Sequence, residues 1–448
     1  MLLFLSALGF AAPVDLPIPT TNATVHRLDN GLTVLIDEDD RTDSVLLHIK
    51  YGVGARDEAD GEHGCAHLFE HLMFEGSANV PNNAFDTWLT AGGGSNNAYT
   101  SDDETAYHMT FPSGALDLAL FLESDRLGFL DAGLDTENLE NQKLVVLQER
   151  EQGFADPHGR DFEALIRLQY PKGHPYHVPT IGTVADVEGF TIEAVTDFWR
   201  RHYRTQNAVM VVTGGIKEAE AMERITHWFS DIPDAGPALE RSKPWDKPYI
   251  PADGVLYDDV EDRTLYISYA TVPLSHEDTY ALDLLGYVLD NGRGTRMADA
   301  LYYASNLATS AWASSWNSEI DGQFILSAAS PSTPLAKLEK KMDAAIKDII
   351  KNPPTADEIE RARQSVYAGL QRSLESPNAR ARMLVSCFEN TGTPNCLADE
   401  WTNIQAVTAE DIVRVASTWL TPERRITLSV VPRDDTGFIA GATEVEIP

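Results

Sequence analysis

The most informative residues of this chain are two histidines and a glutamate in the stretch His67-Leu-Phe-Glu70-His71. Side chains three and four positions apart lie on one face of a helix. The imidazoles of His67 and His71 can therefore hold one Zn²⁺ ion, with Glu70 beside it. Zinc makes a water molecule acidic, and a neighbouring carboxylate can take up its proton. The pattern H-x-x-E-H thus predicts a hydrolytic zinc site.

A catalytic zinc site needs three protein ligands and one position left for water. Two candidates for the third ligand end the apolar helical run Val145-Val-Leu-Gln-Glu149-Arg-Glu151. Glu149 and Glu151 lie two positions apart and cannot share one helical face. A solvated helix end is the other interpretation for either glutamate, so these residues alone leave the choice open. Cys65 points to another face of the histidine helix, and we interpret it as a small core residue.

The elements that must position these side chains are strands mixed with long helices, which favours an α+β fold. The two halves of the chain echo each other, because a helix followed by a strand recurs in the same order. The matching segments are Thr191–Trp199 and Ala208–Thr213 in the first half, and Thr408–Val413 and Ile426–Val431 in the second. So long a period indicates duplicated domains rather than a solenoid. We expect two homologous domains, each a mainly antiparallel sheet packed with helices.

A proline-rich stretch separates the two halves and is typical of an interdomain linker. The predicted division is a zinc-bearing N-terminal domain at residues 20–231, a linker at 232–254 and a homologous C-terminal domain at 255–448.

The second half has lost the predicted metal ligands. Aligning its Gly292 with Gly76 of the first half leaves non-ligating residues at two of the three motif positions. The aligned residues are Asp283, Gly286 and Tyr287. Only the first half is therefore expected to hold zinc, at one ion per chain.

The chain resembles the pitrilysin/insulinase family of zinc peptidases, which carry the inverted motif H-x-x-E-H. It is most similar to the short-subunit branch, with the mitochondrial processing peptidase beta subunit and its bacterial relatives. The resemblance covers most of residues 25–215. It rests on the segments His67–Gly76, Gly93–Thr100, Asp103–Tyr107, Glu123–Arg126, Gly173–Tyr176 and Ile181–Thr183.

The resemblance implies roles for several residues. The family places its third ligand in a Val-Val-x-x-Glu-Arg context, which selects Glu149 over Glu151, and it gives Glu70 the role of general base. It also implies that Asn97 and Ala98 end an edge strand that pairs with the substrate backbone. The alternative is that Asn97 only caps a turn. The paired domains would form half of a peptidase chamber.

The sequence departs from the family pattern at two places. Tyr302 and Thr309 stand where relatives carry an Arg and a Tyr that hold the substrate, while Arg296 matches a structural position. This is typical of heterodimeric members, so the chain would be the zinc-bearing subunit of a heterodimer, or else a homodimer without the pair. Gln142 stands where an acidic residue often supports the metal ligands, and Glu140 is nearby.

The length of 448 residues fits two or more domains, and the hydrophobic content of 43% is ordinary. The net charge of −34 argues against nucleic-acid binding, which needs a basic surface. The charge either attracts basic peptides or keeps the protein soluble in a salty or extracellular setting. No apolar run is long enough to span a bilayer.

Residues 1–12 contain an apolar run, Leu2–Ala12, that resembles the core of a secretory signal, although no Lys or Arg precedes it. We interpret it as a signal remnant, which predicts export to the periplasm or the extracellular space. Cys387 and Cys396 flank a loop that could bring them together. A local disulfide would fit an oxidising compartment, and two buried free thiols are the other interpretation.

These observations predict a zinc endopeptidase that acts on peptides or unfolded polypeptide segments. Two other classes stay open. One is a non-catalytic core or interaction subunit of the same fold, and the other is a chain that is active only when paired. The intact His67, Glu70, His71 and Glu149 argue against the non-catalytic subunit.

Overall fold

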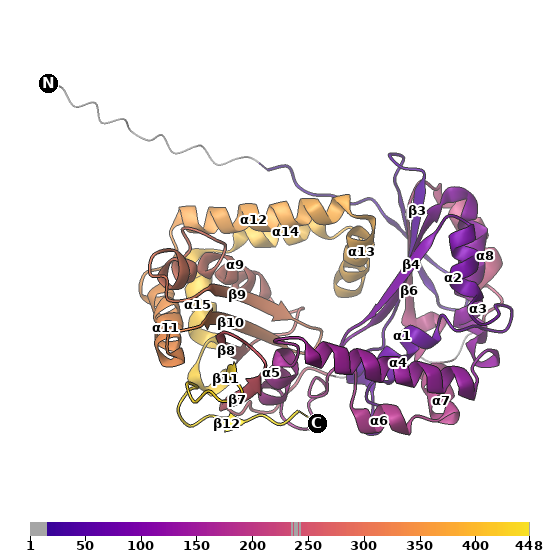
Figure 1. Cartoon of the computed structure of the whole chain (residues 1–448). Coiled ribbons are helices and arrows are strands. Elements are labelled where there is room, and N and C mark those ends of the chain that lie inside the picture. Colours follow the sequence, from indigo (N-terminus) through magenta and orange to yellow (C-terminus); the bar gives the residue numbers. More distant parts are fainter. Residues whose placement is uncertain (1–15, 234–235, 237–240, 242, 448) are drawn as a thin grey trace.

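The computed structural model describes residues 16–233, 236, 241 and 243–447, and it shows two β-sheets with helices around them (Figure 1). The stretch 1–12, predicted as a signal remnant, lies outside the described residues. Each sheet has six strands. The predicted α+β fold of two similar, helix-packed sheets is confirmed, and both sheets are mixed rather than purely antiparallel.

The first sheet has the strand order β1-β2-β6-β3-β5-β4, so β4 lies at an edge. Its strands are β1 (Thr24–Arg27), β2 (Thr33–Glu38), β3 (Ser44–Tyr51), β4 (Ser95–Thr100), β5 (Thr105–Pro112) and β6 (Ala208–Gly214). Neighbours run antiparallel except β2 and β6, which run parallel. The second sheet repeats this plan, with the order β12-β7-β11-β8-β10-β9. Its strands are β7 (Ala252–Asp258), β8 (Arg263–Ala270), β9 (Ser310–Asn317), β10 (Gly322–Ser330), β11 (Arg425–Pro432) and β12 (Thr443–Glu444).

The helices of the first half lie largely on one face of the first sheet. They are α1 (Cys65–Leu72), α2 (Ala84–Ala91), α3 (Leu116–Phe129), α4 (Thr136–Ala155), α5 (Asp161–Gln169), α6 (Val184–Gly189), α7 (Ile192–His202) and α8 (Glu218–Phe229). Those of the second half are α9 (Thr279–Leu289), α10 (Arg296–Ala298), α11 (Leu335–Lys351), α12 (Ala356–Glu375), α13 (Pro377–Thr391), α14 (Leu397–Ala406) and α15 (Ala409–Trp419).

The helix that precedes the last long strand of each half begins in the same way. The hydroxyl of Thr191 accepts a hydrogen bond from the Ala194 N–H at the start of α7, and the hydroxyl of Thr408 accepts one from the Asp411 N–H at the start of α15. Threonine is a favoured N-cap because its oxygen bonds an otherwise unpaired helical N–H. The repeated pattern seen in the sequence therefore corresponds to a repeated cap, helix and strand.

Two helices, one from each half, pack against the sheet of the other half. Helix α5 of the first half packs Ala164 and Leu165 against the second sheet, while α13 of the second half packs Leu384 and Val385 against the first sheet. Figure 1 shows both helices in the space between the sheets. Strand β7 already begins at Ala252, inside the stretch predicted as a linker. The exact domain boundaries stay a prediction.

The sulfur atoms of Cys387 and Cys396 are joined in a disulfide that links the end of α13 to the start of α14. This is the first of the two interpretations left open by the sequence. Cys65 is buried and unbonded, as expected for a core residue. Among the described helices, none has the length and apolar character needed to cross a membrane.

Candidate metal centre

Helix α1 carries the H-x-x-E-H motif, and its start is held by a buried carboxylate. Gly64 precedes the helix with φ at +96°, a backbone conformation that favours glycine and leaves no side chain to cap the helix. The carboxylate of Glu58 takes that place, because it accepts hydrogen bonds from the N–H groups of Gly64 (2.9 Å) and Ala66 (2.7 Å). Glu58 thus fixes the first turn of α1 just before His67.

A second loop lies directly against this helix start. A side chain at Gly182 would meet the carbonyl oxygen of His63 at 2.2 Å, so only glycine allows the approach. Arg150, which follows Glu149 on α4, donates to the Gly182 carbonyl (3.1 Å) and forms a buried ion pair with Glu163 of α5 (3.2 Å). These contacts connect α4 to α1 and so help to position Glu149 next to His67 and His71.

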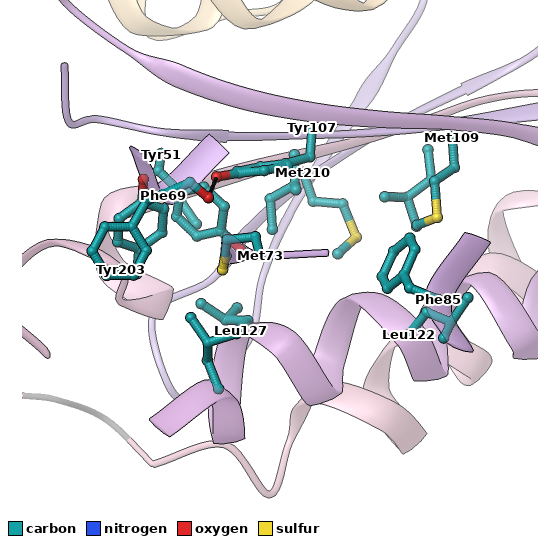
Figure 2. Packing of buried hydrophobic residues seen from close by; sticks show 14 of the residues in the cluster. Tyr51, Phe69, Met73, Phe85, Tyr107, Met109, Leu122, Leu127, Tyr203 and Met210 are labelled. Atoms are coloured by element: carbon teal, nitrogen blue, oxygen red, sulfur yellow. Dashed lines mark hydrogen bonds between the residues drawn. The ribbon is translucent and has the colours of Figure 1, made fainter. Parts of the chain in front are cut away.

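The apolar face of α1 is packed into the core of the first sheet. Figure 2 shows Phe69 and Met73 among Tyr107, Tyr203 and Met210. The Tyr107 hydroxyl donates to the Phe69 carbonyl (2.9 Å), which ties the helix to β5. Because the apolar side of α1 is held this firmly, its polar side is fixed toward α4.

The structure brings the two histidines and Glu149 together. Glu149 Oε2 lies 3.4 Å from His71 Nε2 and 3.7 Å from His67 Nε2, and one ligand atom from each residue lies within 4.8 Å of the others. The Glu149 side chain is 44% exposed, so one side of the group is open. Throughout the part of the chain that the structure describes, this is the one group of three or more such ligands.

The geometry and chemistry of this group fit a zinc ion. Zinc bonds of about 2.0–2.2 Å in a tetrahedral site place ligand atoms about 3.3–3.6 Å apart, close to the 3.4 Å and 3.7 Å between Glu149 Oε2 and the two histidine nitrogens. A histidine must be neutral to bind a metal. Burial lowers the pKa of His67 to about 4, with a smaller contribution from His71, so His67 is neutral near pH 7. His67, His71 and Glu149 would hold the ion.

Glu70 lies beside this group without being part of it. Its Oε2 is 4.0 Å from His67 Nε2 and accepts a hydrogen bond from the Thr100 hydroxyl at 2.8 Å. Burial raises the pKa of Glu70, and the bond from Thr100 acts in the opposite direction. A carboxylate with a raised pKa is a stronger base, and Thr100 at the end of β4 orients it.

The acidic and amide residues that precede Glu149 on α4 do not reach the ligand group. Gln142 donates from its amide to Glu75 (2.5 Å), and Glu140 pairs with Lys143 at the helix surface (2.9 Å). Glu151 is exposed and is not a member of the group. Gln142 is therefore engaged by Glu75 and is not a member of the ligand group.

Asn97 and Ala98 lie in the edge strand β4 of the first sheet as expected, but in its middle and not at its end, because the strand continues to Thr100. Ala98 is partly buried on the side of the α1 core, and Asn97 is exposed. The backbone N–H of Ala98 donates to the side-chain oxygen of Asn97 at 2.8 Å. The Asn97 side chain thus accepts the hydrogen bond of the Ala98 N–H, a backbone donor at the strand edge that an added strand would use.

The residues at the substituted family positions lie in the second half. Tyr302 is 41% exposed in a short helical segment after α10, and the Thr309 hydroxyl donates to Asp262 (2.8 Å). Arg296 pairs with Glu358 at 2.8 Å, which agrees with a structural role.

Helix α9 is the counterpart of α1 in the second half. Asp283 is partly buried there and hydrogen-bonded to Ser315, and desolvation raises its pKa to about 7. Gly286 is buried and offers no side chain, and Tyr287 packs against the core.

Sequence reasoning did not identify Glu58, Thr100 or Arg150 as supports of the site. Thr100 lies inside a segment that carries the family resemblance, and Arg150 ends the Val-Val-x-x-Glu-Arg context of the third ligand, so each could have been suspected. Glu58 lies nine residues before His67 and gives no local signal, because its helix-capping role depends on the turn between them.

Two models of one protein family match the chain. The model described as "Insulinase (Peptidase family M16)" matches residues 33–176, which include Glu70 and the three clustered ligands. The model described as "Peptidase M16 inactive domain" matches residues 189–366, within which α9 lacks a ligand set. The two models thus correspond to the half that carries the candidate ligand group and to the half in which no such group is found among the described residues.

Known relatives match over nearly the whole chain. "Zinc protease PqqE" of Helicobacter pylori is 25% identical over 415 residues, 90% of this chain and 92% of the relative. "Mitochondrial-processing peptidase subunit beta" of Lentinula edodes is 24% identical and covers 88% of this chain and 87% of its own. A solved protease structure from Helicobacter pylori matches with a TM-score of 0.85 at 24% identity, over 92% of this chain and 100% of that one. With both halves matched by models of one family, the chain belongs to the insulinase family of peptidases, family M16.

Proposed function

We propose that this protein is a zinc-dependent endopeptidase that hydrolyses peptides or unfolded polypeptide segments. The observation that carries the proposal is the approach of His67, His71 and Glu149 to within 4.8 Å of one another, with Glu70 beside them. Relatives named as zinc proteases support the same chemistry.

Zinc, when bound, supplies the Lewis acid that acidifies a water molecule and polarises the peptide carbonyl. His67, His71 and Glu149 would hold the ion and leave one side of it open. Glu70 accepts the proton of the attacking water on its carboxylate and then passes this proton to the leaving amine. Thr100 keeps that carboxylate oriented through its 2.8 Å hydrogen bond.

The substrate would bind as an extra strand along β4. Backbone pairing at a sheet edge does not depend on side chains, which suits a peptidase acting on varied unfolded segments. The N–H of Ala98 is one donor for such pairing, once Asn97 releases it. The positions of Asn97 and Ala98 at a free edge support this assignment.

We also propose that the chain works in an oxidising compartment outside the cytoplasm, because its disulfide would be reduced elsewhere. A purified full chain loaded with zinc tests the main proposal directly. It should contain about one zinc per chain and cleave an unfolded protein or a quenched peptide, and a chelator should abolish cleavage. Bound zinc without cleavage, both alone and with a homologous subunit, would identify a non-catalytic subunit instead.

The assignment of the third ligand predicts different behaviour for two neighbouring glutamates. Glu149→Gln should weaken zinc binding by at least about 100-fold. Loss of a residue that only hydrogen-bonds a metal ligand already lowers metal affinity by about 10- to 100-fold, and Glu149 is itself a proposed ligand. Glu151→Gln serves as the matched control on the same helix and should bind zinc normally. Competitive titration with a chelating dye measures both affinities. The reverse order would assign the ligand to Glu151.

The substitutions at Tyr302 and Thr309 predict that the chain alone binds zinc but cleaves slowly. Neither side chain can donate the charge-assisted hydrogen bonds of an arginine fork. Co-expression with a homologous subunit that carries the Arg and Tyr should raise the rate at least about 10-fold, an interaction worth 1.4 kcal/mol or more. Peptidase assays combined with mass measurement in solution test this. Rapid cleavage by a pure monomer or homodimer would exclude an obligate partner.

A further inference from the structure

A cavity of about 700 Å³ lies on the face of the first sheet that is turned away from α1. Tyr99 of β4 lines it on one side, and Arg382 of α13 lines it on another. Successive strand residues face opposite ways, so Thr100 reaches Glu70 while Tyr99 faces this cavity. Figure 1 shows α13 beside the first sheet. The cavity and the candidate metal centre therefore flank the same edge strand from its two faces.

Most charged side chains of the cavity wall take part in ion pairs, and the wall has four carboxylates (Asp103, Glu104, Glu319 and Glu389) and three cations (Lys50, Arg241 and Arg382). The ion pairs that include wall residues are Lys50–Glu104 at 2.9 Å, Lys50–Glu389, Arg241–Glu319 at 2.8 Å and Arg56–Asp103 at 2.8 Å. Burial lowers the pKa of His48 to about 3, so this wall histidine adds no positive charge near pH 7.

Arg382 is the exception. Its guanidinium lies 4.3 Å from the centre of the Tyr99 ring, and among the described residues no carboxylate is within ion-pair distance of it. The neighbouring Arg380 on the same helix is, by contrast, paired with Asp37 at 2.6 Å. Among the cations of the cavity wall, Arg382 is thus the one that no described carboxylate contacts, and it lies over the Tyr99 ring at the strand edge.

A strand added to β4 would place a side chain next to this cation. Lys50, Ala106 and Tyr99 form one row across β3, β5 and β4, and the next position in the row belongs to the added strand. Directly opposite residues in neighbouring strands point to the same face, with Cβ atoms about 4.5–5.5 Å apart. The substrate residue opposite Tyr99 therefore points toward Arg382, while its two neighbours point toward the Glu70 side.

We propose that the cavity beside Tyr99 is a specificity subsite in which Arg382 binds the carboxylate of an Asp or Glu side chain of the peptide substrate. The proposal rests on the proposed peptidase function, because it takes the substrate to bind along β4. This subsite would prefer an acidic side chain, although the overall charge of −34 would by itself favour basic peptides.

Quenched peptides that differ only by Asp, Asn or Lys at one scanned position test the subsite. Their C-termini are amidated, so a terminal carboxylate cannot bind in place of the side chain. The zinc-loaded full chain should cleave the Asp peptide about 5- to 20-fold faster in kcat/KM than the Asn peptide at one position. Arg382→Gln should bring this ratio to about one, and Arg382→Glu should favour Lys there. Arg372→Gln, an exposed arginine on α12, is the control and should keep the ratio.

Binding measured separately distinguishes this proposal from the peptidase function itself. Fluorescence anisotropy with the zinc-loaded Glu70→Gln protein reports peptide affinity without cleavage. A preference for the Asp peptide in binding that depends on Arg382 supports the subsite, even if the native chain cleaves nothing. In that case the proposed peptidase function is wrong but the subsite stands. Cleavage without an Asp preference at any position, or a preference unchanged in Arg382→Gln, overturns the subsite.

Discussion

Replacing Glu70 by Gln should leave zinc bound and lower peptide turnover by about 10²- to 10⁴-fold or more. The amide has the shape of the carboxylate but cannot accept a proton. It also keeps an oxygen for the hydrogen bond from Thr100, so the local structure should survive. Metal analysis and a kcat measurement on the same preparation check that zinc is retained and that turnover is lost.

Thr100→Val is the matched control for this experiment. It removes the 2.8 Å hydrogen bond to Glu70 but leaves the carboxylate itself. Thr100 is a positioning residue, so turnover should fall less than in Glu70→Gln, and the pH at which activity is half-maximal should shift upward, because the bond lowers the pKa of Glu70. If Glu70→Gln cleaved peptides at nearly the normal rate, another group would have to be the base.

Replacing His71 by Ala should remove zinc and with it all peptidase activity. The remaining ligands, His67 and Glu149, leave the ion two protein bonds instead of three, and structural or catalytic zinc sites use three or four. The zinc content should fall from about one per chain to a trace after gel filtration in metal-free buffer. The fold should persist, because α1 is held by its buried apolar face.

His227→Ala provides the comparison, since His227 is also helical but exposed on α8. It should retain both zinc and activity. Thermal unfolding should show His71→Ala close to the zinc-free native chain, because both lack only the stabilisation by bound metal. Stoichiometric zinc in His71→Ala would rule out the proposed ligand set.

The motif residues could be predicted because their geometry is local. His67, Glu70 and His71 share a helical face by their spacing alone, whatever the rest of the fold does. Glu149 is different, because its approach to the histidines depends on how α4 crosses α1. The hydrogen bond from Arg150 to the Gly182 carbonyl and the close approach of Gly182 to His63 connect the two helices. Without the family resemblance, the sequence did not decide whether Glu149 or Glu151 is the third ligand.

The repeat of two α+β halves was also predictable, because caps, helices and strands return in the same order. The exchange of α5 and α13 was not. Amphipathic patterns show that a helix buries one face, but they do not show which sheet receives it. The pairing of Cys387 with Cys396 stayed open for a similar reason, since the spacing of two cysteines does not report their redox state.

The crossed helices mean that neither half is a self-sufficient unit. A shortened protein that ends before α9 would keep His67, Glu70, His71 and Glu149, yet it would lose α13. Leu35, Leu46 and Val211, now covered by that helix, would face water on the open side of the first sheet. A minimal peptidase therefore cannot be made from this chain by simple truncation. Each half therefore contributes one helix that covers apolar residues on the sheet of the other half.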